Sequence, residues 1–386
     1  MTQSSQLASA KIAAEQPQIL SNDKDLFTAS QNWQAAEVLA IDTEFVRERT
    51  YFAALGLIQI SDGVTVWLVD PLEIDDFTPL KDLFTNPDIL KILHSPSEDL
   101  EILLQYFACL PEPMFDSQLA AAALGQPLQI SYQKLLQWQL EIEIDKGETR
   151  SNWLQRPLRK SQLHYAAMDV AYLPMVYQQL ATQLHQQNRY HWVRQDSQIQ
   201  LDKARLPVDT QTLYFKYRDA WRLDNRQRQI LQNLYIWREE TAIKRNLPRS
   251  FVVKDSDLNA IAVAMPSSLS ELKECGELHH HSIRRHGEKI LQIVAGNTIN
   301  SSPINNSAKP PIPLSSEEKA CLQTLKTAVA KIAASLEIDP ANIASRRELE
   351  FLIRNRPLAQ LPARFSGWRE SVLANELKII DQLIRN

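Results

Sequence analysis

Glycine is scarce in this chain, which has only eight among 386 residues. No two of them stand close enough to form a dinucleotide-binding turn or a loop that cradles a phosphate. The three cysteines, Cys109, Cys275 and Cys321, are isolated and have no zinc-ligand spacing. These shortages exclude Rossmann dehydrogenases, P-loop nucleotidases and disulfide-framework proteins, so we expect no nucleotide cofactor.

Long apolar runs are missing as well. None approaches the ~18 residues that a membrane-spanning helix needs, and the polar start MTQSS lacks the layout of a secretory signal. The formal net charge is only −4, but acidic residues prevail before residue 210 and basic residues after it. We therefore expect a cytoplasmic protein without membrane contact, with carboxylate chemistry in its first part and contact with a polyanion in its second.

Hydrophobic patterning predicts a mixed sheet in the first half of the chain. Strand character is found in four segments, 38–41, 55–61, 64–69 and 89–93. Asp62-Gly63 is a hairpin signal between the second and third, so we expect the first three strands to be antiparallel. Helical spacing dominates afterwards, including residues 161–180. A sheet with flanking helices predicts an α/β fold.

Helical spacing continues beyond residue 210, where strand signals fade. A stretch rich in Asn, Ser and Pro interrupts it and is typical of a linker. We expect an α/β domain followed by two small all-α modules. The expected boundaries are 1–208 for the α/β domain, 209–296 for the first helical module, 297–315 for the linker and 316–386 for the second module.

Two acids end the first predicted strand. Residues two apart on a strand share a face, so Asp42 and Glu44 project together. Two carboxylates aimed at one point repel each other unless a cation joins them. The alternative is a solvated strand end that leads into the polar loop Arg47-Glu48-Arg49.

Three further candidates lie on predicted helices. Asp99 falls in a first helical turn, where it either serves a metal site or only complements the helix dipole. Tyr165 and Asp169 are four residues apart and share one helix face. Taken singly, the tyrosine could be a packing residue and the aspartate a surface acid, but four acids and one tyrosine in such positions favour a shared site.

These segments resemble a known family. Ile41-Asp42-Thr43-Glu44-Phe45, the segment from His94 to Leu100, and Tyr165-Ala166-Ala167-Met168-Asp169 are similar to the three exonuclease motifs of the DEDD superfamily in its tyrosine-bearing branch. Trp153-Leu154-Gln155-Arg156-Pro157-Leu158 resembles the form found in the ribonuclease D family. Residues 211–295 resemble the helicase-and-ribonuclease-D C-terminal (HRDC) domain, and residues 316–386 fit an HRDC-like module less clearly.

The resemblance implies a ribonuclease H-like exonuclease domain and a metal-dependent 3′–5′ exoribonuclease. It implies two Mg²⁺ or Mn²⁺ ions, bridged by Asp42, with Glu44 and Asp169 completing one site and Asp99 supporting the other. Tyr165 would orient the attacking water. The expected substrates are tRNA precursors and other small structured RNAs with a single-stranded 3′ end, the product is nucleoside 5′-monophosphate, and the protein is expected to be a monomer.

Two other readings stay open. One is a DNA-directed 3′–5′ exonuclease on the same scaffold, and the other is a non-catalytic RNA-binding protein that retains the fold. The first helical module interleaves basic and aromatic residues, which either contact RNA or form a solvated face over a core. The residues concerned are Tyr214, Phe215, Lys216, Tyr217, Arg218, Trp221, Arg222, Arg226 and Arg228.

Overall fold

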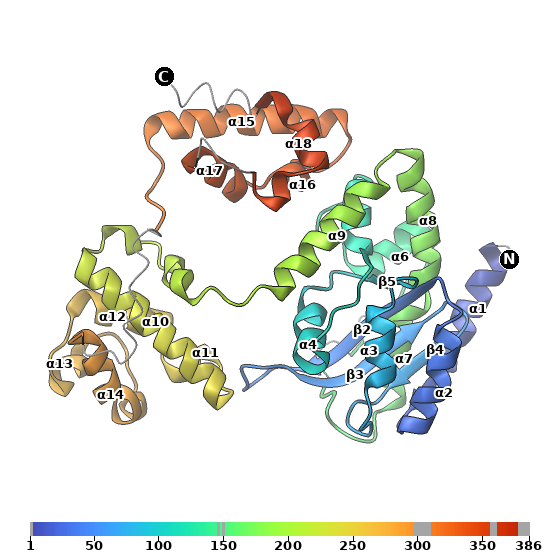
Figure 1. Cartoon of the computed structure of the whole chain (residues 1–386), viewed down its shortest axis with the longest axis horizontal. Helices are drawn as coiled ribbons and strands as arrows, with labels where there is room; N and C mark the ends of the chain where they lie inside the picture. The colour runs from blue at the N-terminus through green and yellow to red at the C-terminus, as the bar shows by residue number, and fades with distance from the viewer. Residues whose placement is uncertain (1–2, 145–146, 149–150, 297–309, 356–360, 377–386) are drawn as a thin grey trace. The chain divides into compact units, whose positions relative to one another are not determined.

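The computed structural model describes residues 3–144, 147–148, 151–296, 310–355 and 361–376 (Figure 1). It divides into two compact units. The first comprises Met1–Val46, Ala54–Leu206 and Leu314–Asn386, and the second comprises Arg47–Ala53 and Pro207–Pro313. Most of the expected linker, residues 297–309, lies outside the described residues. None of the helices in the described ranges is long and apolar enough to cross a bilayer.

A six-stranded mixed sheet forms the centre of the first unit, in the order β1-β4-β3-β2-β5-β6. Its strands are β1 (Gln18–Leu20), β2 (Val38–Val46), β3 (Ala54–Ser61), β4 (Val66–Val69), β5 (Leu90–Leu93) and β6 (Met114–Asp116). The antiparallel pairs β2–β3 and β3–β4 confirm the predicted arrangement, and the other pairs are parallel. The patterning missed β1 and β6, because three-residue edge strands are too short to show a period.

In the described part of this unit, nine helices precede residue 206. They are α1 (Gln3–Glu15), α2 (Asp23–Trp33), α3 (Thr78–Thr85), α4 (Ser97–Phe107), α5 (Ser117–Ala123), α6 (Tyr132–Leu140), α7 (Lys160–Ala171), α8 (Leu173–Gln186) and α9 (Tyr190–Arg205). Helix α7 packs against β2, β3 and β4, and Figure 1 shows it behind the sheet. Ala166, Ala167 and Ala171 of α7 are fully buried, so small side chains bring this helix close to the strands.

The expected single helix over 161–180 is two helices. α7 ends at Ala171 and α8 begins at Leu173, with Tyr172 between them. Pro174 lacks a backbone N–H and restricts the residue before it, which breaks the hydrogen-bond ladder at this point. The start of the helical region predicted beyond residue 210 likewise forms two short 3₁₀ segments, Thr210–Lys216 and Ala220–Arg222.

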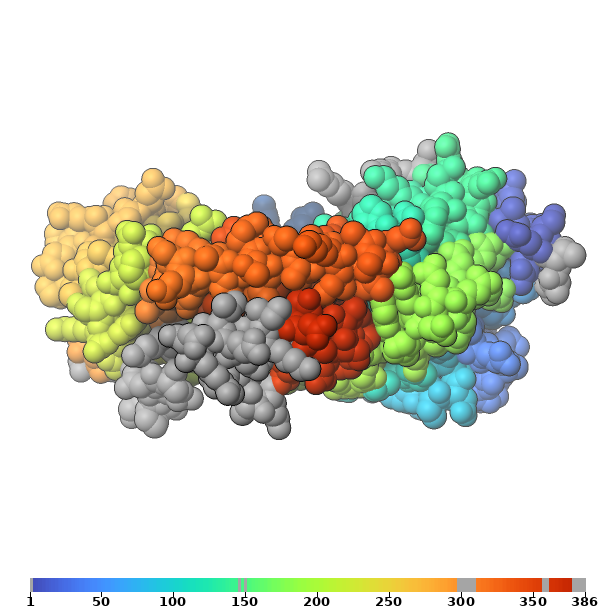
Figure 2. Space-filling view, turned by 90° about the horizontal axis from the view of Figure 1, so that it is seen from above, coloured from blue at the N-terminus to red at the C-terminus, as the bar shows by residue number. Residues whose placement is uncertain are grey.

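The C-terminal helices group with the first unit. They are α15 (Ser316–Ser335), α16 (Pro340–Ile343), α17 (Arg346–Arg354), the 3₁₀ turn η3 (Ala363–Phe365) and α18 (Trp368–Val372). They share a small apolar core around Leu325, Leu352 and Phe365. In Figure 2 the red residues near the C-terminus lie directly against the green surface of α8 and α9.

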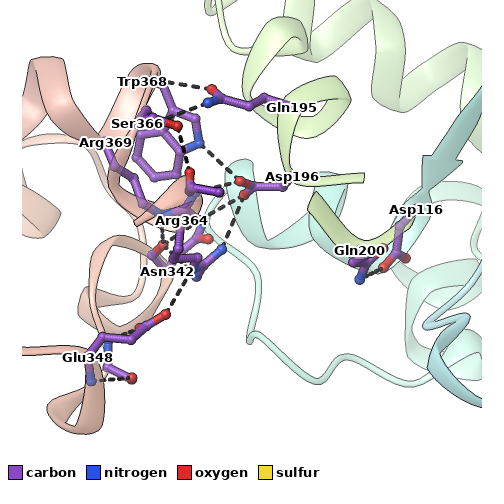
Figure 3. A network of polar contacts seen from close by, with 12 residues as sticks. Asp116, Gln195, Asp196, Gln200, Asn342, Glu348, Arg364, Ser366, Trp368 and Arg369 are labelled. Atoms are coloured by element: carbon purple, nitrogen blue, oxygen red, sulfur yellow. Dashed lines mark hydrogen bonds and ion pairs between the residues drawn. The ribbon is translucent and has the colours of Figure 1, made fainter. Parts of the chain in front are cut away.

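A buried ion pair joins these helices to α9 (Figure 3). Arg369 is fully buried and places its guanidinium against Asp196, with Nη1–Oδ1 and Nη2–Oδ2 distances of 2.5 and 2.8 Å. The same guanidinium donates to the carbonyl of Asn342. Beside it, the rings of Trp192 and Trp368 stack with centroids 4.2 Å apart. The docking is therefore both apolar and charge-paired.

Two of the rare glycines lie at this interface. Gly367 has a φ of +66°, and a Cβ at this position would collide with the side-chain amide of Gln195. Gly125 has a φ of +90°, and its Cβ would stand 2.5 Å from the carbonyl oxygen of Glu337. Any side chain would therefore separate the two surfaces or strain the backbone.

The second unit is helical. It contains η1 (Thr210–Lys216), η2 (Ala220–Arg222), α10 (Asn225–Arg245), α11 (Arg249–Val252), α12 (Asp255–Ala264), α13 (Leu269–Glu274) and α14 (His280–Val294). Its core gathers apolar side chains of α10, α12 and α14, such as Leu234, Leu258 and Ile290. The β2–β3 connection is part of this unit, where the hydroxyl of Tyr51 donates to the buried Glu239 at 2.5 Å.

Candidate active site

Three of the predicted acids meet on the face of the sheet that α7 covers. Asp42 and Glu44 lie two residues apart on β2, on the face that Ala40 shares with the core beneath α7. Asp169 comes from the last turn of α7. Each offers a carboxylate oxygen, and these oxygens all lie within 4.8 Å of one another. Carboxylate oxygens alone suit a hard divalent cation such as Mg²⁺ or Mn²⁺.

The acids raise one another's pKa values. Burial lifts the pKa of Asp42 well above its ordinary value, and the charges of Asp99, Asp169 and Glu44 add to this. Burial, then Asp169 and Asp99, raises the pKa of Glu44 to about 9. Burial raises the pKa of Asp169 to about 7. Carboxylates clustered in this way bind either protons or a cation, and a bound cation would lower their pKa values again.

Asp99 is held apart from the other three acids. It is the third residue of α4 and is buried, and it accepts a hydrogen bond of 2.5 Å from the hydroxyl of Thr43. Thr43 alternates with Asp42 and Glu44 along β2, so its side chain faces away from theirs. The charge of Asp99 is still close enough to raise the pKa of both. Asp99 therefore acts electrostatically on Asp42 and Glu44 from the first turn of α4.

Tyr165 lies one turn before Asp169 on α7, and its hydroxyl hydrogen-bonds to the Asp169 carboxylate. Burial and the charges of Asp169, Glu44 and Asp42 raise the pKa of the phenol above its ordinary value. The hydroxyl thus keeps its proton at neutral pH and can orient a neighbouring group, but it is a poor general base.

The segment after Ser151 packs against Tyr165 through Trp153. Trp153 is buried, and its ring lies 6.2 Å from that of Tyr165. Arg156 anchors the segment by donating to both carboxylate oxygens of Asp70 and to the carbonyls of Gly56 and Trp153. A Cβ at Gly56 would stand 2.6 Å from the Trp153 carbonyl, so this close approach needs a glycine.

The sequence analysis did not identify Tyr132 as a residue close to the acid cluster. This residue of α6 is buried, and its hydroxyl donates to the carbonyl of Met168 at 3.2 Å. The charges of Asp169 and Asp42 reach it, since they raise its pKa together with burial. Tyr132 therefore ties α6 to the turn of α7 that bears Asp169. A tyrosine one residue after the helix-capping Ser131 has no pattern that distinguishes it from a core residue.

The aromatic residues proposed for the first helical module mostly belong to its core. Tyr214 is buried, and Phe215 and Tyr217 pack against the same cluster. Arg222 lies over the ring of Trp221, 5.0 Å from its centroid. Lys216 instead lines a pocket of about 450 Å³ within the second unit. The other lining residues are Arg47, Glu48, Thr50, Tyr51, Arg238, Pro248, Arg249, Ser250, Lys254 and Asp255.

Known proteins share both parts of this architecture. Residues 17–185 match the family described as 3′-5′ exonuclease, and residues 227–294 match the HRDC domain. The chain is 35% identical over 367 residues to ribonuclease D of Shewanella sp. (strain ANA-3), covering 94% of each chain. It is 33% identical over 365 residues to ribonuclease D of Escherichia coli (strain K12), covering 93% of this chain and 97% of that one.

Solved structures agree. The crystal structure of E. coli RNase D, described as an exoribonuclease involved in structured RNA processing, matches with a TM-score of 0.87 and 33% identity, covering 95% of this chain and 99% of that one. The catalytic core of RRP6 from Trypanosoma brucei shares the fold, with a TM-score of 0.59 at 24% identity over 73% of this chain and 79% of that one. The chain therefore belongs to the ribonuclease D family of 3′–5′ exoribonucleases.

Proposed function

We propose that this exoribonuclease trims single-stranded 3′ ends of tRNA precursors and other structured RNAs, one nucleotide at a time, and releases nucleoside 5′-monophosphates. We further propose that it acts as a monomer in the cytoplasm, where free Cys109, Cys275 and Cys321 suit a reducing environment. The observation that supports the chemistry best is the convergence of Asp42, Glu44 and Asp169 beside the hydroxyl of Tyr165.

The acids fit two divalent cations. In this proposal Asp42, Glu44 and Asp169 would hold the ions through their carboxylates, and Asp99 would support them. Bound Mg²⁺ or Mn²⁺ would supply Lewis-acid chemistry, acidifying water and neutralising charge on the scissile phosphate. The protein's own part is to hold these oxygens in place: Thr43 fixes Asp99 from one side of β2, while α7 presents Asp169 from the other.

Tyr165 orients the attacking water in this scheme. Its proton is engaged with Asp169, so its oxygen can accept a hydrogen bond from water and direct that water toward the phosphorus. We expect Tyr165→Phe to lower turnover by about 10- to 100-fold, because a small misplacement of a reacting atom costs about that much. Mn²⁺ affinity, followed by calorimetry, should stay at the parental value. Equal turnover of variant and parent would remove Tyr165 from the mechanism.

The pocket of the second unit suits an RNA backbone. Five basic side chains line it against two acidic ones, and the hydroxyl of Ser250 adds a neutral donor. Two of the cations already have acidic partners: Arg249 pairs with Glu239, and Arg238 pairs with Asp255. Lys216 and Lys254 are exposed and make no ion pair within the described ranges. Phosphodiester groups therefore have cations available here.

Matched oligomers test the substrate class. A single-stranded RNA, its DNA counterpart and an RNA with a paired 3′ end should be incubated with Mn²⁺, and the products resolved by chromatography. We expect nucleoside 5′-monophosphates from the single-stranded RNA and little from the other two. Equal release from DNA would favour a DNA-directed exonuclease, while binding of RNA without release would favour the non-catalytic reading.

A further inference from the structure

Gln59 stands out among the buried polar residues. It lies in the middle of β3 with no exposed surface, and neither its amide nitrogen nor its amide oxygen has a hydrogen-bond partner among the described residues. Buried side-chain amides almost always find partners, because removing them from water without replacement lowers stability. An apolar residue would pack here at no such cost, so this amide calls for another explanation.

The register of the sheet places Gln59 directly opposite Asp42. These two residues are Cα partners in the antiparallel β2–β3 pair. Opposed residues of such a pair share a face, with Cβ atoms about 4.5–5.5 Å apart, which is within reach of a glutamine amide. Gln59 is thus on the face where Asp42 meets Asp169 of α7.

The other neighbours of Gln59 on this face do not provide for its amide. Leu68 is its partner on β4, and Leu57 precedes it by two residues on β3; both are apolar members of the core. Ser61, two residues later, accepts a hydrogen bond from the backbone of Gly63 and makes none with the Gln59 amide. Among these strand neighbours, Asp42 bears the carboxylate that a glutamine N–H can serve.

We propose that Gln59 is a positioning residue for Asp42. Its Nε2–H donates to a carboxylate oxygen of Asp42 when that carboxylate is ionised and holds a cation, and this bond keeps the remaining lone pairs aimed at the cation. Carboxylates that ligate metals generally have such partners, which set their orientation. A glutamine adds no charge, so it can orient Asp42 without competing for the cation. This inference rests on the ligand role proposed for Asp42.

Gln59→Leu tests the proposal, because leucine removes both amide atoms and leaves similar volume. We expect Mn²⁺ to bind about 10- to 100-fold more weakly by calorimetry, as when other partners of metal ligands are lost. In EDTA the thermal midpoint of the variant should be equal to or above that of the parent, since an unpartnered amide has left the core. Opposite effects on metal binding and metal-free stability separate positioning from mere packing.

Gln232→Leu is the matched control. Gln232 is also buried, but its amide donates to Gln211, so its loss should lower the thermal midpoint and leave Mn²⁺ affinity unchanged. Gln59→Met serves as a second variant if Gln59→Leu does not fold. Parental Mn²⁺ affinity in either folded variant would overturn the proposal. If the parent itself bound no Mn²⁺ and released no nucleotide, the proposed function would fail instead.

Discussion

Asp42→Asn is expected to reduce nucleotide release by roughly 10³-fold or more. This loss exceeds the about 10- to 100-fold that follows when only a hydrogen-bond partner of a metal ligand is mutated. The amide keeps the shape of the side chain but removes a charge from the centre of the acid cluster, where the carboxylates of Asp42, Glu44 and Asp169 converge. Release of 5′-monophosphates from a single-stranded RNA at saturating Mn²⁺ measures the effect. A rate equal to the parental rate would remove Asp42 from the site.

The same substitution should have the opposite effect on the metal-free protein. Because the folded state raises the pKa of Asp42, ionisation of this group opposes folding once the pH exceeds its ordinary value of about 3.9. Asparagine removes that penalty, so in EDTA the variant should be more stable than the parent, by a margin that grows as the pH rises above that ordinary value. Asp82→Asn, an exposed acid of α3, is the control and should change neither rate nor this margin.

Arg369→Ala is expected to lower the free energy of unfolding by about 3–5 kcal/mol, as when one partner of a buried ion pair is removed. Asp196 would then lie buried with only Trp368 Nε1, at 3.4 Å, and the more distant Arg364 near it. The Trp368 ring, which stacks on Trp192, would also lose its contact with the guanidinium of Arg369. Urea unfolding measures the loss, and limited proteolysis should release the C-terminal helices early.

Arg346→Ala supplies the comparison for this prediction. Arg346 pairs with Glu350 on the surface of α17 at 2.8 Å, and such i,i+4 pairs contribute only about 0.3–0.5 kcal/mol. A second comparison is the double variant with Asp196→Ala, which should lose less than the sum of the two single variants because both remove one interaction. If Arg369→Ala were as mild as Arg346→Ala, the pair would not be what holds the C-terminal helices in place.

The docked C-terminal helices are also connected to the active site, through α9. Helix α9 packs against α4, which bears Asp99, and its Gln200 donates to Asp116 at the end of β6. Asp116 in turn accepts from the backbone of Ser95, just before α4. Deleting the C-terminal helices would therefore uncover Asp196 and Trp192 on the element that supports Asp99. Their removal is expected to affect the catalytic unit itself and not only RNA contacts.

Local patterns were enough to predict much of this protein. The apolar run before Asp42, the Asp62-Gly63 hairpin and the four-residue spacing of Tyr165 and Asp169 depend on strand and helix periods, which adjacent residues determine. The motifs built on these periods pointed to the family. Edge strands of three residues and the break at Tyr172 were missed, since the first have no measurable period and the second depends on one proline.

Only the tertiary structure decided which residues distant in the chain contact one another. The bond from Thr43 to Asp99, the register that sets Gln59 against Asp42, and the burial of Arg369 on Asp196 each join residues whose separation in the chain reveals nothing of their contact. Sheet register and helix docking are set by how whole surfaces fill space, which no local spacing encodes. The sequence thus determined which acids are available, and packing decided how they are held and what supports them.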